Sequence, residues 1–310
     1  MNVGHETKSE PQAAAKRSTR LSLPGTIIWV TCIHIALGLA ALSAYVLSGN
    51  VTWIRVYFDY QGALFFLAFG GLEFVLATLA RQQFYADEPL HKAWTFIMLA
   101  SAIRWVGLVV GNWLSAPTYI NPLFYFVRPW DPQAAASLRE FGLMVGRFNM
   151  VLLAVGLGIV LRTYMRLGIL ARLKLIDYSM LALVVGFVLR QGLQIYHLVS
   201  HQTGPLTFKA MHLWLTDPAL ACLLVEAVLL RRAVISMGWG LISKVWGAYT
   251  LAIFLTSVAH IGVWAHSYRY ITWHVAAVTW YIWFLVTAAY ALGPAHQVQA
   301  SIRARDQLRT

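Results

Sequence analysis

GTIIWVTCIHIALGLAALSAYVL, the stretch at residues 25–47, contains no Asp, Glu, Lys or Arg. A helix of about 20 apolar residues is long enough to cross the hydrocarbon core of a bilayer. Only helices and closed barrels satisfy their backbone groups in lipid, and barrel strands alternate in polarity over about ten residues. The stretch therefore predicts a membrane-spanning helix.

Seven further apolar runs of similar length follow along the chain. The eight predicted spans are 25–47, 61–79, 94–114, 143–161, 176–199, 211–230, 245–264 and 271–292. The composition agrees, because 59% of the 310 residues are hydrophobic and 12% are charged, whereas a soluble domain carries about 25% charged residues. The sequence predicts an all-α fold, a polytopic integral membrane helix bundle of about eight transmembrane helices.

The basic residues lie mainly at the ends of the runs, and they orient the bundle. With the N-terminus inside, the cytoplasmic segments hold sixteen Lys and Arg and the outer segments hold five. Cytoplasmic segments of membrane proteins carry the excess of positive charge. Both termini are therefore expected in the cytoplasm, with the protein in a bacterial inner (plasma) membrane. This distribution also explains the net charge of +12 without a nucleic-acid partner.

The chain divides into a membrane domain and two short tails. Residues 1–22 are expected to form a disordered basic cytoplasmic tail, residues 23–295 the eight-helix transmembrane domain, and residues 296–310 a second cytoplasmic tail. The segment 115–140 is rich in Pro and aromatic residues, which suit the headgroup region of a membrane, so it is expected to be an outer loop. No segment is long enough to fold as a separate soluble domain.

Besides histidines, six ionisable residues lie well inside the predicted spans, where charge is costly and marks a functional site by default. They are Glu73, Arg104, Arg147, Arg190, Asp217 and Glu226. Glu73 and Arg104 lie at similar depth in adjacent spans and are expected to pair, and so are Arg190 and Asp217. Such a buried charge network either fixes helix register through ion pairs, or forms a proton path or a clamp for an anionic group.

Histidines gather near one membrane face. Because successive spans alternate in direction, six of them fall in one layer near the outer face: His197, His201, His212, His260, His266 and His274. Four of these, His197, His212, His260 and His274, are predicted to lie inside helices, where a rigid backbone can hold a ligand.

Opposed imidazoles on facing helices are typical ligands of a b-type haem. His197 with His260, or His212 with His274, would supply such a metal-binding pair, and Arg190 lies on the same helix face as His197, where it could pair with a haem propionate. The alternative is an interfacial belt without a ligand, since these histidines have Trp and Tyr neighbours, which also suit that depth.

Two further patterns exclude classes of metal enzyme but do not identify the function. His197 and His201 form an H-x-x-x-H box, but Leu198 stands where zinc proteases need Glu, and no His-His pair of the desaturase kind occurs. The leading hypothesis is a membrane electron-transfer subunit that binds haem b or a related tetrapyrrole and exchanges electrons with quinone. A sensory or scaffolding module that acts through other protein subunits, and a small proton-coupled transporter, are the alternatives. Whether the protein is an enzyme stays open.

Overall fold

The computed structural model describes residues 22–307 except 51, 54–56, 111–131, 171, 202–207, 239, 268–269 and 271–272. Within helices it does not describe the side chains of 58–60, 132–140, 143, 146, 197–198, 201, 208–215, 263–264, 266–267 and 273–280. The described part holds eight α-helices and one short π-helix, η1. Their bounds are α1 Leu23–Ser48, η1 Tyr57–Gly62, α3 Ala63–Arg81, α4 Pro89–Leu108, α5 Pro132–Arg166, α6 Leu175–His201, α7 Phe208–Met237, α8 Leu241–Ser267 and α9 Trp273–Gln307.

Each α-helix includes most of one of the eight apolar runs, and the all-α architecture is confirmed. Five helices of the described part are long and apolar enough to cross a membrane: Leu23–Ser48, Ala63–Arg81, Arg147–Arg166, Leu175–Tyr196 and Leu241–Gly262. They are compatible with an integral membrane protein. The total of eight spans stays a prediction.

Three helices extend furthest beyond their apolar runs. α5 begins at Pro132, inside the segment 115–140 expected as an outer loop. Proline suits the first turn of a helix, and the alanines that follow favour helix strongly. α7 continues to Met237, and α9 continues through Gly293 and Pro294 to Gln307. Ala and Arg, which favour helix, occur in both extensions. The C-terminal tail predicted from residue 296 is therefore helical up to residue 307.

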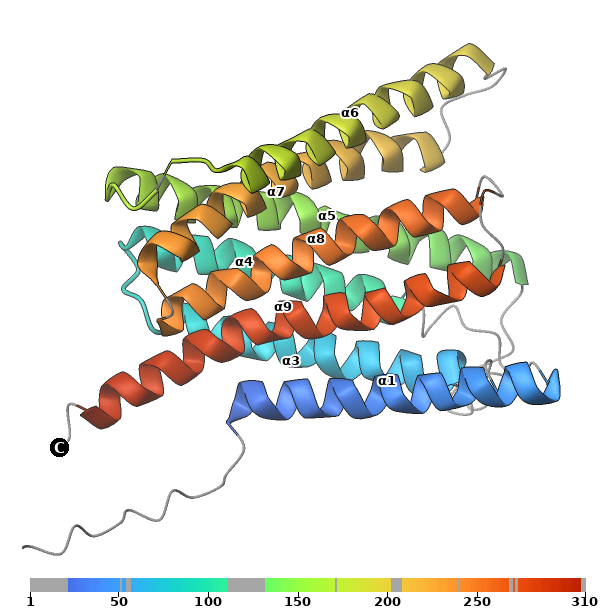
Figure 1. Ribbon diagram of the computed structural model, residues 1–310, viewed down its shortest axis with the longest axis horizontal. Helices are drawn as coiled ribbons and strands as arrows, with labels where there is room; N and C mark the ends of the chain where they lie inside the picture. The colour runs from blue at the N-terminus through green and yellow to red at the C-terminus, as the bar shows by residue number, and fades with distance from the viewer. Residues whose placement is uncertain are drawn as a thin grey trace, which may run out of the picture.

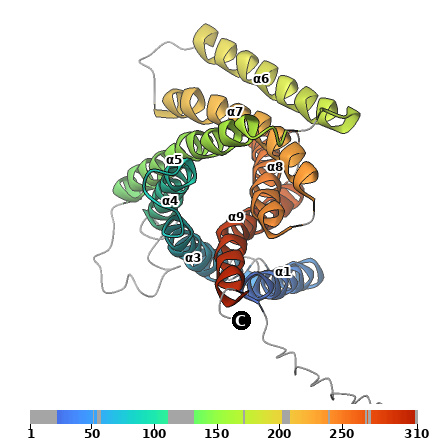
Figure 2. The ribbon, with the colours of Figure 1, turned by 90° about the vertical axis from the view of Figure 1, so that its left-hand side faces the viewer.

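Six of the helices form a closed ring. The order around it is α3, α4, α5, α7, α8 and α9, and α9 packs against α3 to complete the circle (Figure 2). α6 lies outside the ring against α7, and α1 lies outside it against α9. Each peripheral helix thus precedes three consecutive ring helices in the chain. Figure 1 shows that α1 begins and α9 ends at the same end of the bundle, here named the tail end; the opposite one is named the far end.

An aromatic cluster attaches α1 to the ring. The ring of His34 stacks on Phe65 of α3 with centroids 4.2 Å apart. The hydroxyl of Tyr57 donates to the carbonyl of His34 at 2.9 Å, and that of Tyr281 donates to the carbonyl of Gly38 at 2.8 Å. A Cβ on Gly38 would lie 2.5 Å from Tyr57, so glycine is required for this close approach.

Candidate functional site: the interior of the helix ring

A buried ion pair joins the middle of α3 to the second half of α4. Glu73 is 3% exposed and pairs with Arg104 through Oε2. Its other oxygen, Oε1, accepts a hydrogen bond from Ser101 Oγ at 2.9 Å. Ser101 and Arg104 are three residues apart on one face of α4. The structure thus brings together the first pair of charges singled out in the sequence.

Arg104 also reaches across the ring. Its guanidinium carbon lies 4.2 Å from the centroid of the Tyr290 ring on α9, a cation–π arrangement. The rings of Tyr290 and Tyr249 are 6.1 Å apart, and Tyr249 belongs to α8. Because α4 lies between α3 and α5 in the ring, its contact with α9 runs through the interior. Arg104 therefore links helices of both halves of the chain.

A layer of aromatic side chains fills the ring between this pair and the tail end. Trp94 of α4 lies 5.8 Å from Trp246 of α8, and Trp246 lies 5.9 Å from Tyr249, centroid to centroid. The indole N–H of Trp246 donates to the hydroxyl of Tyr164 on α5 at 2.5 Å. All four are buried. This layer was not predicted from the sequence, because Trp and Tyr are frequent throughout the chain. The pattern Lys-x-Trp at the start of both α4 and α8 is its one local signal.

A second polar group, here named the far-end cluster, lies nearer the far end. Arg147 of α5 and Arg190 of α6 both lie close enough to Asp217 of α7 to interact with it electrostatically, and Gln191 is its neighbour. Arg147 and Arg190 also act on His260 of α8. Four consecutive helices thus contribute to one cluster, which holds two guanidinium groups and one carboxylate. Arg190 and Asp217, expected to pair, are placed together.

His260 connects the two polar groups. Its Nδ1 lies 3.1 Å from the carbonyl oxygen of Thr256 one turn earlier, and its ring packs on Trp283 at 5.2 Å between centroids. Thr256 in turn interacts with Tyr290, the tyrosine that Arg104 contacts. His260 is the one predicted haem ligand whose side chain is described; the side chains of His197, His212 and His274, and of His201 and His266, lie outside the described residues.

The remaining acid that lies well inside a predicted span, Glu226, lies apart from both groups. It faces α5, where its Oε1 lies 3.2 Å from the position that a Cβ on Gly158 would take. Its Oε2 is buried and has no hydrogen-bond partner. Glu226 therefore differs from Glu73, which was grouped with it in the predicted charge network.

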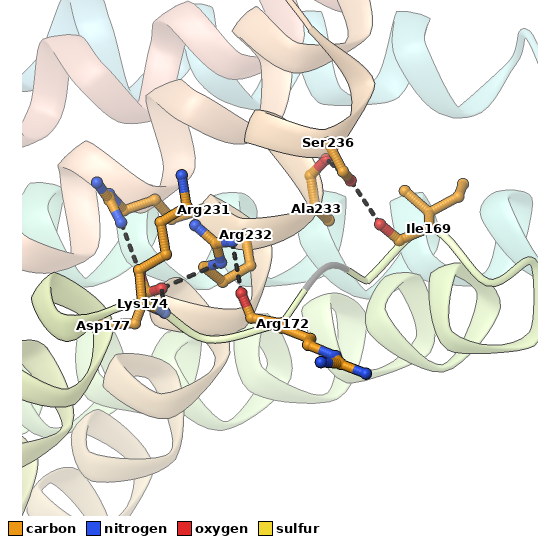
Figure 3. Close-up of polar contacts among 8 residues, drawn as sticks. All are labelled: Ile169, Arg172, Lys174, Asp177, Arg231, Arg232, Ala233 and Ser236. Atoms are coloured by element: carbon orange, nitrogen blue, oxygen red, sulfur yellow. Dashed lines mark hydrogen bonds and ion pairs between the residues drawn. The ribbon is translucent and has the colours of Figure 1, made fainter.

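A polar clamp at the tail end was missed in the sequence (Figure 3). Asp177, near the start of α6, is fully buried and lies 2.6 Å from Arg231 Nη1 and 3.0 Å from Arg232 Nε of α7. It also accepts the backbone N–H of Lys174 at 2.7 Å. Arg232 donates to the carbonyl of Arg172 at 2.6 Å. An Asp in the first turn of a helix is the signal that could have revealed it.

No group of three or more His, Cys, Asp or Glu side chains suited to a metal ion occurs among the residues whose positions the structure gives. Comparison of the chain with protein-family profiles, curated proteins and solved structures finds no match.

Proposed function

We propose that the protein spans a bacterial plasma membrane eight times, with the tail end in the cytoplasm. The Lys and Arg distribution supports this orientation, with sixteen residues in segments assigned to the tail end and five in those assigned to the far end. In this orientation the far-end cluster lies in the outer half of the membrane, and the aromatic layer lies between it and the cytoplasm.

We further propose that α5, α6, α7 and α8 bind a small anionic solute at the far-end cluster, and that the protein carries this solute across the membrane. The observation that supports this function is the convergence of Arg147, Arg190, Asp217 and His260 from four helices. Charges within a membrane protein face a binding site or pathway by default. Two guanidinium groups against one carboxylate leave an excess of positive charge, and the planar guanidinium binds carboxylate or phosphate in a bidentate manner.

The aromatic layer supports a carrier more than an open channel. Trp94, Trp246 and Tyr249 are at most 2% exposed and contact one another across the ring. A solute bound at the far-end cluster would reach the cytoplasm only after the ring helices moved apart at this layer. Movement of helices around a fixed central site is the usual mode of secondary transporters.

The expected result is anion binding that depends on Arg147. Purified protein would be tested with succinate and with inorganic phosphate, by thermal stabilisation in detergent and by uptake of the labelled anion into proteoliposomes. Arg147→Gln should weaken binding about tenfold or more, since hydrogen bonds to charged groups contribute about 1.5–3 kcal/mol. Arg162→Gln is the matched control, because Arg162 lies on the same helix but is exposed.

Cysteines introduced at Tyr85 and Tyr270, which are 79% and 71% exposed at opposite ends of the bundle, would report the orientation of the protein in the same vesicles. The proposal would be contradicted if neither anion stabilised the protein and neither was taken up. It would also be contradicted if the two arginine substitutions had equal effects.

Electron transfer through a b-type haem is the second candidate. The observation in its favour is the contact between His260 Nδ1 and the carbonyl of Thr256. A ring N–H donated to a carbonyl fixes the tautomer and leaves Nε2 as the atom that can bind a metal. Arg190 lies close enough to interact with the same imidazole. His197, His212 and His274 are the proposed partners of His260.

Protein purified from haem-replete cells should then show a low-spin b-type absorption spectrum. His260→Ala should abolish it, because loss of an axial ligand removes six-coordination. His34→Ala is the control, since His34 lies in the aromatic cluster of α1. A colourless folded protein would exclude this candidate function and would not contradict the anion-transport proposal.

A further inference from the structure

Glu226 stands out among the three intramembrane acids of this chain. Glu73 is paired with Arg104, and Asp217 lies beside Arg147 and Arg190. In the part of the chain that the structure describes, no ion pair reaches Glu226, and its buried Oε2 has no hydrogen-bond partner. Among the described residues, its carboxyl group therefore has no charge to balance its own.

The basic groups with described side chains on the adjoining α5, α6 and α8 are engaged or exposed. Arg147 and Arg190 act on Asp217, and Arg166 and Lys244 are exposed. On α7 itself, Arg231 and Arg232 contact Asp177 of α6. On α5, Arg162 lies one turn beyond Gly158 and is exposed. Around Glu226 the chain is apolar, as the sequence Leu223-Leu-Val-Glu-Ala-Val-Leu-Leu230 shows.

Gly158 provides the room for the carboxyl group on the facing helix. A Cβ atom on residue 158 would lie 3.2 Å from Oε1 of Glu226. The half-buried Glu226 therefore lies where the absence of a side chain on α5 leaves space between α5 and α7.

We propose that Glu226 is a reversible proton-binding site between α5 and α7. An ionised carboxylate in an apolar medium is very costly without a cation or donors, so such a group binds a proton instead. A metal ion would need several oxygen ligands, and no group of that kind is found around Glu226 in the described residues. The ligand is therefore a proton.

Dicyclohexylcarbodiimide, an apolar reagent that reacts with protonated carboxyl groups, tests the proposal directly. The full-length protein in detergent would be treated at neutral pH and the adduct located by peptide mass spectrometry. Glu226 should be labelled and Glu73, held by Arg104, should not. Glu226→Gln should lose the adduct, and alkaline pH should suppress it. In Arg104→Gln, Glu73 should become reactive, which would show that the reagent enters the bundle.

Infrared spectroscopy gives a second measurement that needs no chemical modification. The wild-type spectrum should contain the C=O stretch of a protonated carboxylic acid, which disappears at alkaline pH, returns on acidification and is absent from Glu226→Gln. Two results would overturn the proposal. One is a C=O band that persists in Glu226→Gln, and the other is an Arg104→Gln protein in which the reagent labels Glu73 but not Glu226. Neither measurement uses a transported solute or a haem, so the result of each is independent of whether the proposed function is correct.

Discussion

Arg104→Ala is expected to lower the free energy of unfolding by about 3–5 kcal/mol, because it leaves the carboxylate of Glu73 buried without its cation. Glu73 is 3% exposed, so water cannot take the place of the guanidinium. The substitution also removes the cation–π contact with Tyr290. Reversible unfolding of the protein in mixed micelles, with increasing amounts of denaturing detergent, measures the change.

A double substitution separates charge from packing. Arg104→Met combined with Glu73→Gln removes both charges, and the amide oxygen introduced by the second change could still accept the hydrogen bond from Ser101. The loss should therefore be smaller than that of Arg104→Ala. Arg162→Ala, at an exposed position, should change the stability by less than about 0.5 kcal/mol. An Arg104→Ala variant as stable as Arg162→Ala would show that the pair contributes little.

Asp177→Ala is expected to cost about 3 kcal/mol and to release the start of α6 from α7. The carboxylate is fully buried and contacts Arg231 and Arg232 as well as the backbone N–H of Lys174. Its removal leaves the almost fully buried guanidinium of Arg232 without its counter-ion. Hydrogen exchange of the peptide that covers 172–180, read by mass spectrometry together with overall stability, measures both effects.

Asp177→Asn is the matched variant for the clamp. The amide oxygen can still accept the N–H of Lys174 at the helix start, but the negative charge between the two arginines is lost. Its stability should fall between those of the wild type and Asp177→Ala. Unchanged exchange over 172–180 in both variants would mean that α6 is held by its apolar contacts with α7 alone.

The positions of the helices were predictable because the signal is local. A run such as 245–264 contains both the length and the composition that a membrane helix requires. The early start of α5 at Pro132 was not predicted, because the polar turn that precedes an apolar run has no hydrophobic signal and only helix propensity indicates it. The ring order depends on which helix faces pack together, which no single segment specifies.

Within the candidate site, the predicted depth of a residue in its span indicated which charged residues pair better than the residue type did. Glu73 and Arg104 lie at similar depth on consecutive helices, so they could be matched by counting residues from the membrane surface. The contact of Arg104 with Tyr290 could not be predicted this way, because α4 and α9 are far apart in the chain and meet only across the ring. Asp177 was overlooked because it lies at the very start of its apolar run, where acidic residues are ordinary.

The closed ring also imposes an order on biosynthesis. Gln83, just after α3, accepts hydrogen bonds from Gln297 and Ser301 of α9 at 3.1 Å and 2.5 Å, although α9 is the last of these helices to leave the ribosome. The pair of Glu73 with Arg104 needs only α3 and α4, so these two charges can neutralise each other early in synthesis. The contacts of α9 with Arg104 and with α3 form only when α9 has been made, so five ring helices exist before the sixth completes their circle.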